Sequence, residues 1–345
     1  MRSIVNISGT RRALLGAMGA VMTLGVSAGF ASAADKIAVG ALRFTSHAAS
    51  FVAFERGYFK DEGLDVEFKY FQAAQPMAVA IASGDVDFGV TAITGGLINL
   101  ADKGAVRIIG GALMEEKGID GSAILVSKAA FDGGLTSPSK LGGHSFAITQ
   151  PGSSFHYMAS QVIKKEGIAR SALSLKPLQK VGAIIGALKS GQVDSWAIVP
   201  HIAKGLAKGG AVKIIGWVNN YIPDYQVTTV FTSLKTTQNN RGLVERFLRA
   251  FSKGAADFNA ALVDKTAGKA KAEEMVKLIH KYVYASRPYA KAAPSIRNGA
   301  MRLSPGAKLN LDSVKAQLAW FQAEGLIKDT VTIDKLVDTS FVETN

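Results

Sequence analysis

The hydrophobic pattern changes period in the same way at two places in the chain. At the first, an apolar run with helical spacing ends at Gly84, and a short run that alternates every second residue follows. At the second, the same change occurs at Gly191, 107 residues later. Because glycine is typical of the position just after a helix, each place predicts a helix that stops at the glycine and leads into a strand.

Further segments recur at nearly the same offset along the chain. Each pair has the same order of apolar and polar residues, and a single shared offset is hard to reach by chance. The repeats therefore predict two halves built on one plan. The matching segments begin at Glu62 and Glu166, at Val106 and Val212, and at Ser122 and Thr228.

Strands and helices alternate along both halves, which predicts an α/β fold with open, mostly parallel sheets covered by helices on both faces. We expect two similar α/β lobes, with residues 34–121 plus 226–345 in lobe 1 and residues 122–225 in lobe 2. The two crossings between the lobes predict a two-segment hinge with the ligand cleft between them. Strands are expected at residues 36–42, 64–71, 85–90, 106–113, 141–150, 173–178 and 193–199.

The N-terminal segment is typical of an export signal. Arg11 and Arg12 precede an apolar, Ala- and Gly-rich run that ends with three small residues. This pattern predicts a signal peptide over residues 1–33, of the twin-arginine or the Sec type, cleaved after about Ala33. The chain contains no cysteine, which excludes disulfides, thiolate metal sites and a lipid-carrying cysteine. We therefore expect a free periplasmic protein.

The chain of 345 residues is basic, with a formal net charge of +13. This charge suits an anionic ligand or an acidic partner surface, and a solvated basic surface with neither role is the alternative. The basic residues are scattered, and no run combines them with stacking aromatic residues. Nucleic acid is therefore not expected as a partner.

A binding site is expected where loops follow the carboxyl ends of the strands, because ligands of open parallel sheets bind there. The duplication places such loops in equivalent positions in both halves, so a ligand would lie between them. The loops fall at residues 43–47, 91–94, 111–114, 150–156, 200–201 and 217–221. The candidate ligand-binding residues are Arg43, Phe44, Thr45, Ser46, His47, Gln72, Thr91, Ala92, Thr94, Gly152, Ser153, Ser154, His156, Trp196, Pro200, His201, Trp217 and Tyr221.

The turn at residues 152–154 is the main candidate for holding an anion. Small residues at a helix start leave N–H groups and two hydroxyls free to face a ligand, although an ordinary N-cap would use the same residues. Arg43 could bind a carboxylate or sulfonate through two hydrogen bonds, or simply lie on the surface. Four aromatic residues could wall an apolar ligand or pack in the core instead, namely Phe44, Trp196, Trp217 and Tyr221.

Three histidines fall on the predicted cleft loops, namely His47, His156 and His201. Together they could bind a metal ion. Their spacing matches no metal-binding motif, and no carboxylate supports them, so neutral hydrogen-bonding roles are favoured.

Three aspartates lie at helix-to-strand turns, namely Asp85, Asp87 and Asp194. A carboxylate that accepts hydrogen bonds from backbone N–H groups is favoured over a catalytic role at such turns. The chain has no motif of a phosphate-binding loop, a zinc protease or a serine hydrolase. We therefore expect no enzyme activity, no cofactor and no resident metal.

Five segments resemble one protein family: AFERGYFKDEGLDVEF, AIASGDVDFGV, SPSKLGGHSFAI, PGSSFHY and ALKSGQVDSWAIVP. They are similar to the periplasmic substrate-binding proteins of nitrate, sulfonate, taurine and bicarbonate ABC importers and of their thiamine-precursor relatives. The resemblance implies a type II periplasmic binding protein that closes on a small molecule and delivers it to a membrane permease. It also implies that residues 44–47 and 152–154 face the ligand. Relatives often carry an acidic residue where this chain has Val199, before Pro200, so no particular ligand carries over.

From these features we expect a monomeric periplasmic receptor of an ABC importer that captures a small organic anion. An alkyl or aromatic sulfonate or carboxylate, or a taurine-like molecule, is favoured as the ligand. One alternative is an enzyme of thiamine-pyrimidine biosynthesis on the same fold, although such relatives carry a cysteine-rich motif that this chain lacks. Another is a receptor for nitrate, a pyrimidine or a metal ion.

Overall fold

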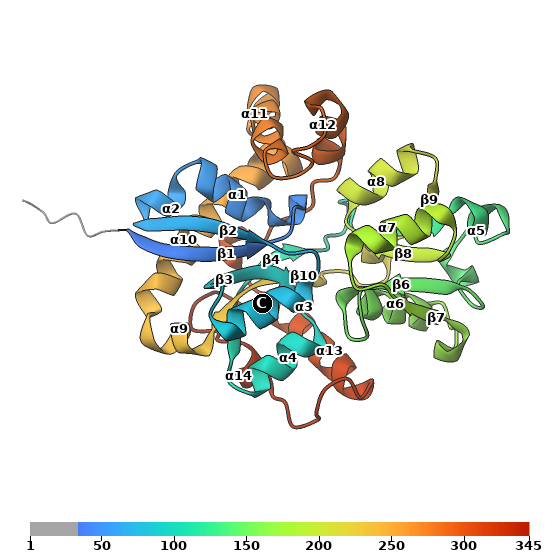
Figure 1. Cartoon of the computed structure of the whole chain (residues 1–345), viewed down its shortest axis with the longest axis horizontal. Coiled ribbons are helices and arrows are strands. Elements are labelled where there is room, and N and C mark those ends of the chain that lie inside the picture. The colour runs from blue at the N-terminus through green and yellow to red at the C-terminus, as the bar shows by residue number, and fades with distance from the viewer. Residues whose placement is uncertain (1–33, 345) are drawn as a thin grey trace, which may run out of the picture. The chain divides into compact units, whose positions relative to one another are not determined.

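A computed structural model describes residues 34–344. The predicted signal peptide lies outside the described residues. Within them, the chain forms two β-sheets, each with its own helices (Figure 1). In this range no helix is long and apolar enough to cross a membrane.

The two sheets have five strands each, in an equivalent order. Sheet A has the order β2-β1-β3-β10-β4, and sheet B has the order β7-β6-β8-β5-β9. In both, the strand in the fourth position is antiparallel to its two neighbours and the remaining pairs are parallel, which gives the mostly parallel α/β sheets that were expected. Sheet A comprises β1 (Asp35–Ala41), β2 (Leu64–Tyr70), β3 (Phe88–Ala92), β4 (Val106–Met114) and β10 (Gln226–Ser233). Sheet B comprises β5 (Ala123–Ser127), β6 (Ser145–Ile148), β7 (Ser174–Pro177), β8 (Ser195–Ile198) and β9 (Val212–Trp217).

Two strands of sheet A extend further than the sequence predicted. The loop expected at residues 91–94 is wrong in part, because β3 continues to Ala92, and the loop expected at residues 111–114 is wrong throughout, because β4 continues to Met114. Both extensions pair with β10, where Thr91 lies opposite Thr229 and Met114 opposite Gln226. A pairing partner far away in the sequence decides where these strands end, and the local pattern does not contain that information.

Helices pack against sheet A in two hydrophobic clusters. In one, α10 packs on α1 so closely that a Cβ atom at Gly254 would lie 2.2 Å from the carbonyl oxygen of Ala49. In the other, α3, α4, α13 and α14 pack together with β4. The helices of the first half are α1 (Ala48–Glu55), α2 (Tyr58–Asp61), α3 (Ala74–Ser83) and α4 (Gly95–Asp102). The C-terminal helices are α9 (Leu234–Asn239), α10 (Arg241–Phe258), α11 (Gly268–His280), α12 (Tyr289–Asn298), α13 (Leu311–Ala323) and α14 (Ile333–Leu336).

Sheet B carries a smaller set of helices, one of which also meets the C-terminal region. These helices are α5 (Lys128–Asp132), α6 (Ser154–Lys165), α7 (Val181–Ser190) and α8 (Pro200–Lys208). The side chain of Lys204, on α8, donates a hydrogen bond to the carbonyl oxygen of Asn298 at the end of α12 at 2.7 Å. The C-terminal helices therefore contact both halves of the chain.

The chain passes between the sheets twice, at residues 115–122 and 218–225. The two crossings are bonded to each other, because the N–H of Glu115 donates to the carbonyl oxygen of Tyr225 at 2.8 Å. The side-chain amide of Asn219 adds a bond to the carbonyl oxygen of Ile119 at 2.7 Å. The buried carboxylate of Glu115 accepts the N–H of Ser122 at 3.0 Å. The crossings thus form one hydrogen-bonded unit between the sheets.

The duplicated aspartates have the same structural role in both sheets. Asp87 accepts the N–H of Ala38 at 2.7 Å, and Asp194 accepts the N–H of Ser145 at 2.8 Å. Each carboxylate therefore binds the strand in the second position of its sheet, β1 or β6, rather than closing its own turn. Asp85 is exposed, and its carboxylate bonds only to the hydroxyl of Ser83 among the described residues.

Replacing Asp87 by alanine is expected to lower the free energy of unfolding by about 1–3 kcal/mol, because the half-buried N–H of Ala38 then loses its acceptor. Asp85→Ala is the matched control and should change stability by less than about 0.5 kcal/mol. Urea unfolding of both variants measures the difference. Equal destabilisation by the two substitutions would contradict the assigned role.

Candidate functional site

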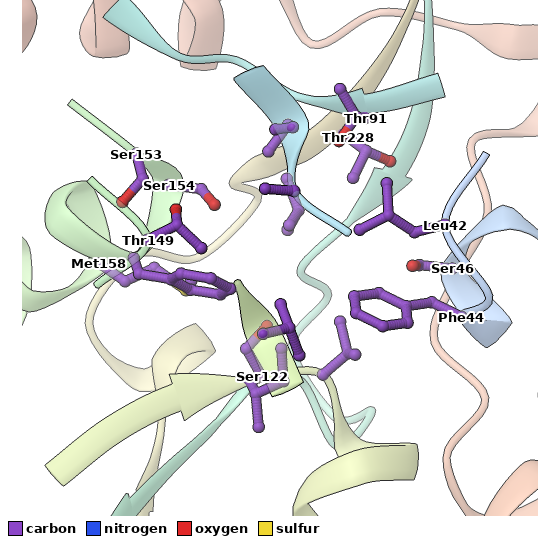
Figure 2. Close-up of a pocket in the computed structure, with 18 of the residues that line it drawn as sticks. Leu42, Phe44, Ser46, Thr91, Ser122, Thr149, Ser153, Ser154, Met158 and Thr228 are labelled. Carbon is purple, nitrogen blue, oxygen red and sulfur yellow. The ribbon is translucent and has the colours of Figure 1, made fainter. Parts of the chain in front are cut away.

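A cavity of about 60 Å³ lies between the two sheets. Its lining comes from the carboxyl ends of strands, from helix starts and from the strand that follows the second crossing (Figure 2). Apolar side chains such as Leu42, Phe44 and Met158 form much of the wall. The space suits a compact ligand that contacts both halves of the chain at once.

The two halves touch each other around this cavity. The N–H of Gly95, at the start of α4, donates to the carbonyl oxygen of Gly152 at 2.9 Å. On another side, the hydroxyl oxygen of Thr45 lies 3.2 Å from Nδ1 of His201. The described residues therefore adopt a closed arrangement in which the cavity is largely covered.

Seven of the predicted site residues line the cavity. They come from the loop after β1, from the end of β3 and from the start of α6, and so from both sheets. Figure 2 shows several of them turned toward the central space. The seven are Phe44, Ser46, His47, Thr91, Ala92, Ser153 and Ser154.

Arg43 lies outside this cavity, in contrast to the role considered for it. Its guanidinium lies 3.6 Å from the centre of the Tyr70 ring and donates to the carbonyl oxygen of Tyr282 at 3.2 Å. With Gln72, Arg43 lines an adjoining surface groove that shares Leu42, Phe44 and Val181 with the cavity. No described residue that lines the cavity carries an ammonium, a guanidinium or a carboxylate group.

The three histidines are buried and act as neutral hydrogen-bonding groups. Nδ1 of His47 accepts the N–H of Leu42 at 3.4 Å, and Nδ1 of His156 accepts the N–H of Gly152 at 3.2 Å. Burial lowers the pKa of His47 and of His201 to about 3, and burial together with the charge of Arg170 lowers the pKa of His156 to about 4. Within residues 34–344 no group of His and acidic residues is placed to hold a metal ion.

The predicted aromatic walls are only partly realised. Phe44 lines the cavity. Trp196 is fully buried behind the cavity and packs edge-on against Phe155, with the two ring centres 5.4 Å apart. Trp217 is the last residue of β9, and the Nζ atom of Lys204 lies 5.7 Å from the centre of its ring. The hydroxyl of Tyr221 donates a hydrogen bond to the carboxylate of Glu166 at 2.5 Å. These three side chains belong to the frame around the site and do not reach the cavity.

The remaining predicted residues support the walls. Thr94 caps α4 by accepting the N–H of Leu97, and Pro200 is the first residue of α8. Gly152 and Thr45 make the contacts between the halves described above, and His201 is the partner of Thr45. They position the lining residues and are absent from the lining itself.

Two lining hydroxyls have no hydrogen-bond partner among the described residues. They belong to Ser122, at the end of the first crossing, and to Thr228, on β10. Ser122 is 1% exposed and Thr228 is 6% exposed. A buried hydroxyl without a partner is unusual and calls for a ligand or another explanation.

Sequence reasoning missed twelve lining residues. Ser122, Val227 and Thr228 were recognised as crossing segments, but their pattern is that of an ordinary buried strand. Others lie one position outside the predicted loops, and helix-start positions such as Val181 resemble core residues. The twelve are Leu42, Ala73, Ala74, Ser122, Thr149, Phe155, Met158, Val181, Ile198, Val199, Val227 and Thr228.

Glu115, beneath Ser122, is a buried acid outside the cavity lining. Burial raises the pKa of Glu115 to about 7, and the hydrogen bonds that the N–H of Ser122 donates to this carboxylate oppose that shift. A Cβ atom at Gly121 would lie 1.7 Å from this carboxylate. The glycine therefore leaves the space that the acid occupies.

Comparison with known proteins gives one family and several solved structures of similar fold. The family model described as NMT1/THI5 like matches residues 44–261. No curated protein matches the sequence. The alkanesulfonate-binding protein SsuA from Xanthomonas axonopodis pv. citri, bound to MOPS, is 17% identical with a TM-score of 0.69, over 91% of this chain and 100% of that one.

Two further solved structures have the same fold. The periplasmic nitrate-binding protein NrtA from Synechocystis PCC 6803 is 14% identical with a TM-score of 0.70, over 89% of this chain and 87% of that one. The ligand-binding component of an ABC-type import system from Staphylococcus aureus, with zinc bound, is 13% identical with a TM-score of 0.70, over 89% of this chain and 97% of that one.

Proposed function

We propose, from the premise that the chain belongs to the NMT1/THI5-like family, that it is the solute-binding receptor of an ABC import system. The observation that carries the proposal is the closed cavity lined by both sheets and bordered by residues that follow both crossings. Such a site is complete only when the two halves meet. Binding and closure are therefore one event.

The proposed mechanism is closure about the two crossings, with lobes formed by residues 34–121 plus 226–345 and by residues 122–225. A ligand that contacts both lobes only when they are closed shifts the population toward the closed state. A change from mostly open to mostly closed needs about 5 kcal/mol of differential binding. A few hydrogen bonds and the burial of a compact apolar body supply energy of this order.

The proposed setting is the periplasm, with a membrane permease as the partner that receives the ligand from a monomeric receptor. The solved proteins of the same fold support this setting, because they include a periplasmic binding protein and a binding component of an ABC-type import system. An enzyme on the same fold is the alternative. The absence of cysteine from the sequence and of charged groups from the described lining favours a receptor.

The ligand is proposed to be a small organic molecule. The organic anion expected from the sequence is supported by the hydroxyls at the start of α6 and by the sulfonate- and nitrate-binding proteins of the same fold. Arg43, which was considered as a partner for it, contacts Tyr70 and Tyr282. Anions and neutral solutes therefore both belong in a ligand screen.

The function is tested by adding sulfonates, aromatic acids, nitrate, pyrimidines and neutral analogues of the acids to the purified protein. At least one compound should raise the melting temperature, because a ligand that binds only the folded state stabilises it. The same compound should reduce the radius of gyration measured by X-ray scattering. A protein that no compound stabilises, or whose size stays constant with a bound ligand, would refute a closing receptor.

A further inference from the structure

Among the described residues, no side chain that lines the cavity carries a charge that could neutralise a charged ligand. Its lining contains apolar side chains, hydroxyls and one imidazole, that of His47, which is buried and accepts a backbone N–H through Nδ1. Two cations near the lining in the sequence have other partners, and the side chain of Lys180, next to Val181, is exposed. Arg43 contacts Tyr70 and Tyr282, and Arg170 pairs with Glu324 at 2.6 Å. A buried ion without such a partner is costly.

Some of the backbone donors at the helix starts around the cavity are already bonded within the chain. At α6, the N–H of Gly152 donates to His156 and the N–H of His156 donates to the Oγ atom of Ser153. At α4, the N–H of Gly95 donates to Gly152 and the N–H of Leu97 donates to Thr94. Helix N-termini bind anions through free N–H groups, and here the chain itself satisfies part of that capacity. The N–H groups of Ser154 and Phe155, both in the lining, have no acceptor among the described residues and can bond a neutral carbonyl or sulfonyl oxygen as well as an anion.

Two buried side-chain atoms of the lining have no hydrogen-bond partner among the described residues, namely the hydroxyl oxygens of Ser122 and Thr228. Figure 2 shows them on opposite sides of the cavity. Both are held in place by their backbones, since the N–H of Ser122 donates to Glu115 and Thr228 pairs with Ala92 in the sheet. A hydroxyl can both donate and accept, so two fixed hydroxyls suit neutral groups such as an alcohol, an amide or a carbonyl.

We propose that the cavity selects an uncharged, compact and mainly apolar molecule whose hydrogen-bonding groups reach Ser122 and Thr228. This inference rests on the proposed receptor function and names the class of its ligand. Ser122 and Thr228 act as specificity-determining residues because each would be left buried and unpaired by a purely apolar ligand. A charged analogue of the same shape would lose its hydration without gaining a counter-charge.

The test compares matched pairs of compounds that differ mainly in charge: benzamide and benzoate, propionamide and propionate, methanesulfonamide and methanesulfonate. Melting temperature and calorimetric titration at about pH 7 are the readouts for the full exported protein, because benzamide, propionamide and methanesulfonamide stay neutral there. The neutral member of at least one pair should bind roughly tenfold more tightly or better, which is a difference of about 1.4 kcal/mol.

Two variants remove the proposed contacts, and the chain offers matched controls for both. Ser122→Ala and Thr228→Val should each lower the affinity for the neutral ligand by roughly tenfold. The stability of the folded state should not fall, because neither hydroxyl has a hydrogen-bond partner in it. Thr229→Val and Ser50→Ala remove hydroxyls that are equally buried and unpaired but outside the cavity lining. They should leave the affinity unchanged.

The possible results separate the two levels of the proposal. Tighter binding of the charged members overturns the inference and leaves the receptor function standing. Equal losses of affinity in Thr228→Val and Thr229→Val overturn the role of Thr228. If no compound of the pairs or of the wider screen stabilises the protein, both the inference and the receptor function fail.

Discussion

Valine in place of Gly299 is expected to weaken ligand binding strongly while leaving the stability of the ligand-free protein nearly unchanged. Gly299 follows α12 with a φ of −110°, which any residue can adopt. A Cβ atom there would lie 2.3 Å from the Cα atom of His201, at the start of α8. The two residues belong to opposite proposed lobes, so the overlap exists only when the lobes are closed.

The size of the effect follows from the energy of overpacking. Forcing a side chain into a filled space costs about 1–3 kcal/mol, and here the lobes can relieve it by staying apart. A penalty of that size on the closed state lowers the apparent affinity by roughly 5- to 150-fold. Calorimetric titration and the ligand-induced change in the radius of gyration measure both consequences.

Gly186→Val is the matched control for this experiment. Gly186 lies on α7, and a Cβ atom there would meet nothing within 4 Å. The ligand affinity of Gly186→Val, and the decrease in its radius of gyration on ligand binding, should match those of the unaltered protein. Normal binding and compaction by Gly299→Val would show that closure does not bring Gly299 against His201 in solution.

The architecture was predictable because the duplication leaves local signals. Gly84 and Gly191 both end helices in the left-handed conformation, as the change of period indicated. The crossing runs that start near Ser122 and Thr228 occupy the same fourth position in their sheets. Patterns of local sequence therefore predicted the fold class and the family, and the sheet topology and the family model confirm both.

The site was less predictable because contacts between distant residues decide it. Nothing near Arg43 in the sequence indicates that its guanidinium lies on Tyr70 and reaches Tyr282. Trp196 alternates like a cleft residue but packs behind the cavity against Phe155. Conversely, Ser122 and Thr228 look like ordinary strand residues, and only the closed arrangement shows that their hydroxyls lack partners.

The neutral histidines lead to the last prediction, a loss of stability in acid. The pKa values of His47 and His201 fall to about 3 and that of His156 to about 4 in the folded protein, against about 6.5 in the unfolded chain. The unfolded state therefore binds protons first as the pH falls. The stabilisation that the three neutral histidines contribute is therefore complete above about pH 6.5 and is lost progressively below that pH.

Glu115 acts in the opposite direction over part of this range. Its pKa of about 7 lies above the ordinary value of a glutamate, so its contribution is complete below about pH 4.5 and declines as the pH rises toward 7. Each shifted group changes the free energy of unfolding by at most about 1.4 kcal/mol per pH unit. Three histidines against one acid leave a net loss on the order of 3 kcal/mol between about pH 6.5 and 5.

Urea unfolding at several pH values measures this slope, and two substitutions of opposite effect test its origin. His47→Gln should flatten the pH dependence by up to one third of the histidine contribution, because one buried imidazole no longer titrates. Glu115→Gln should steepen it by removing the opposing acid, while its amide oxygen can still accept the N–H of Ser122. An unchanged slope in both variants would assign acid unfolding to other groups, and a steeper slope in His47→Gln would reverse the sign argued here.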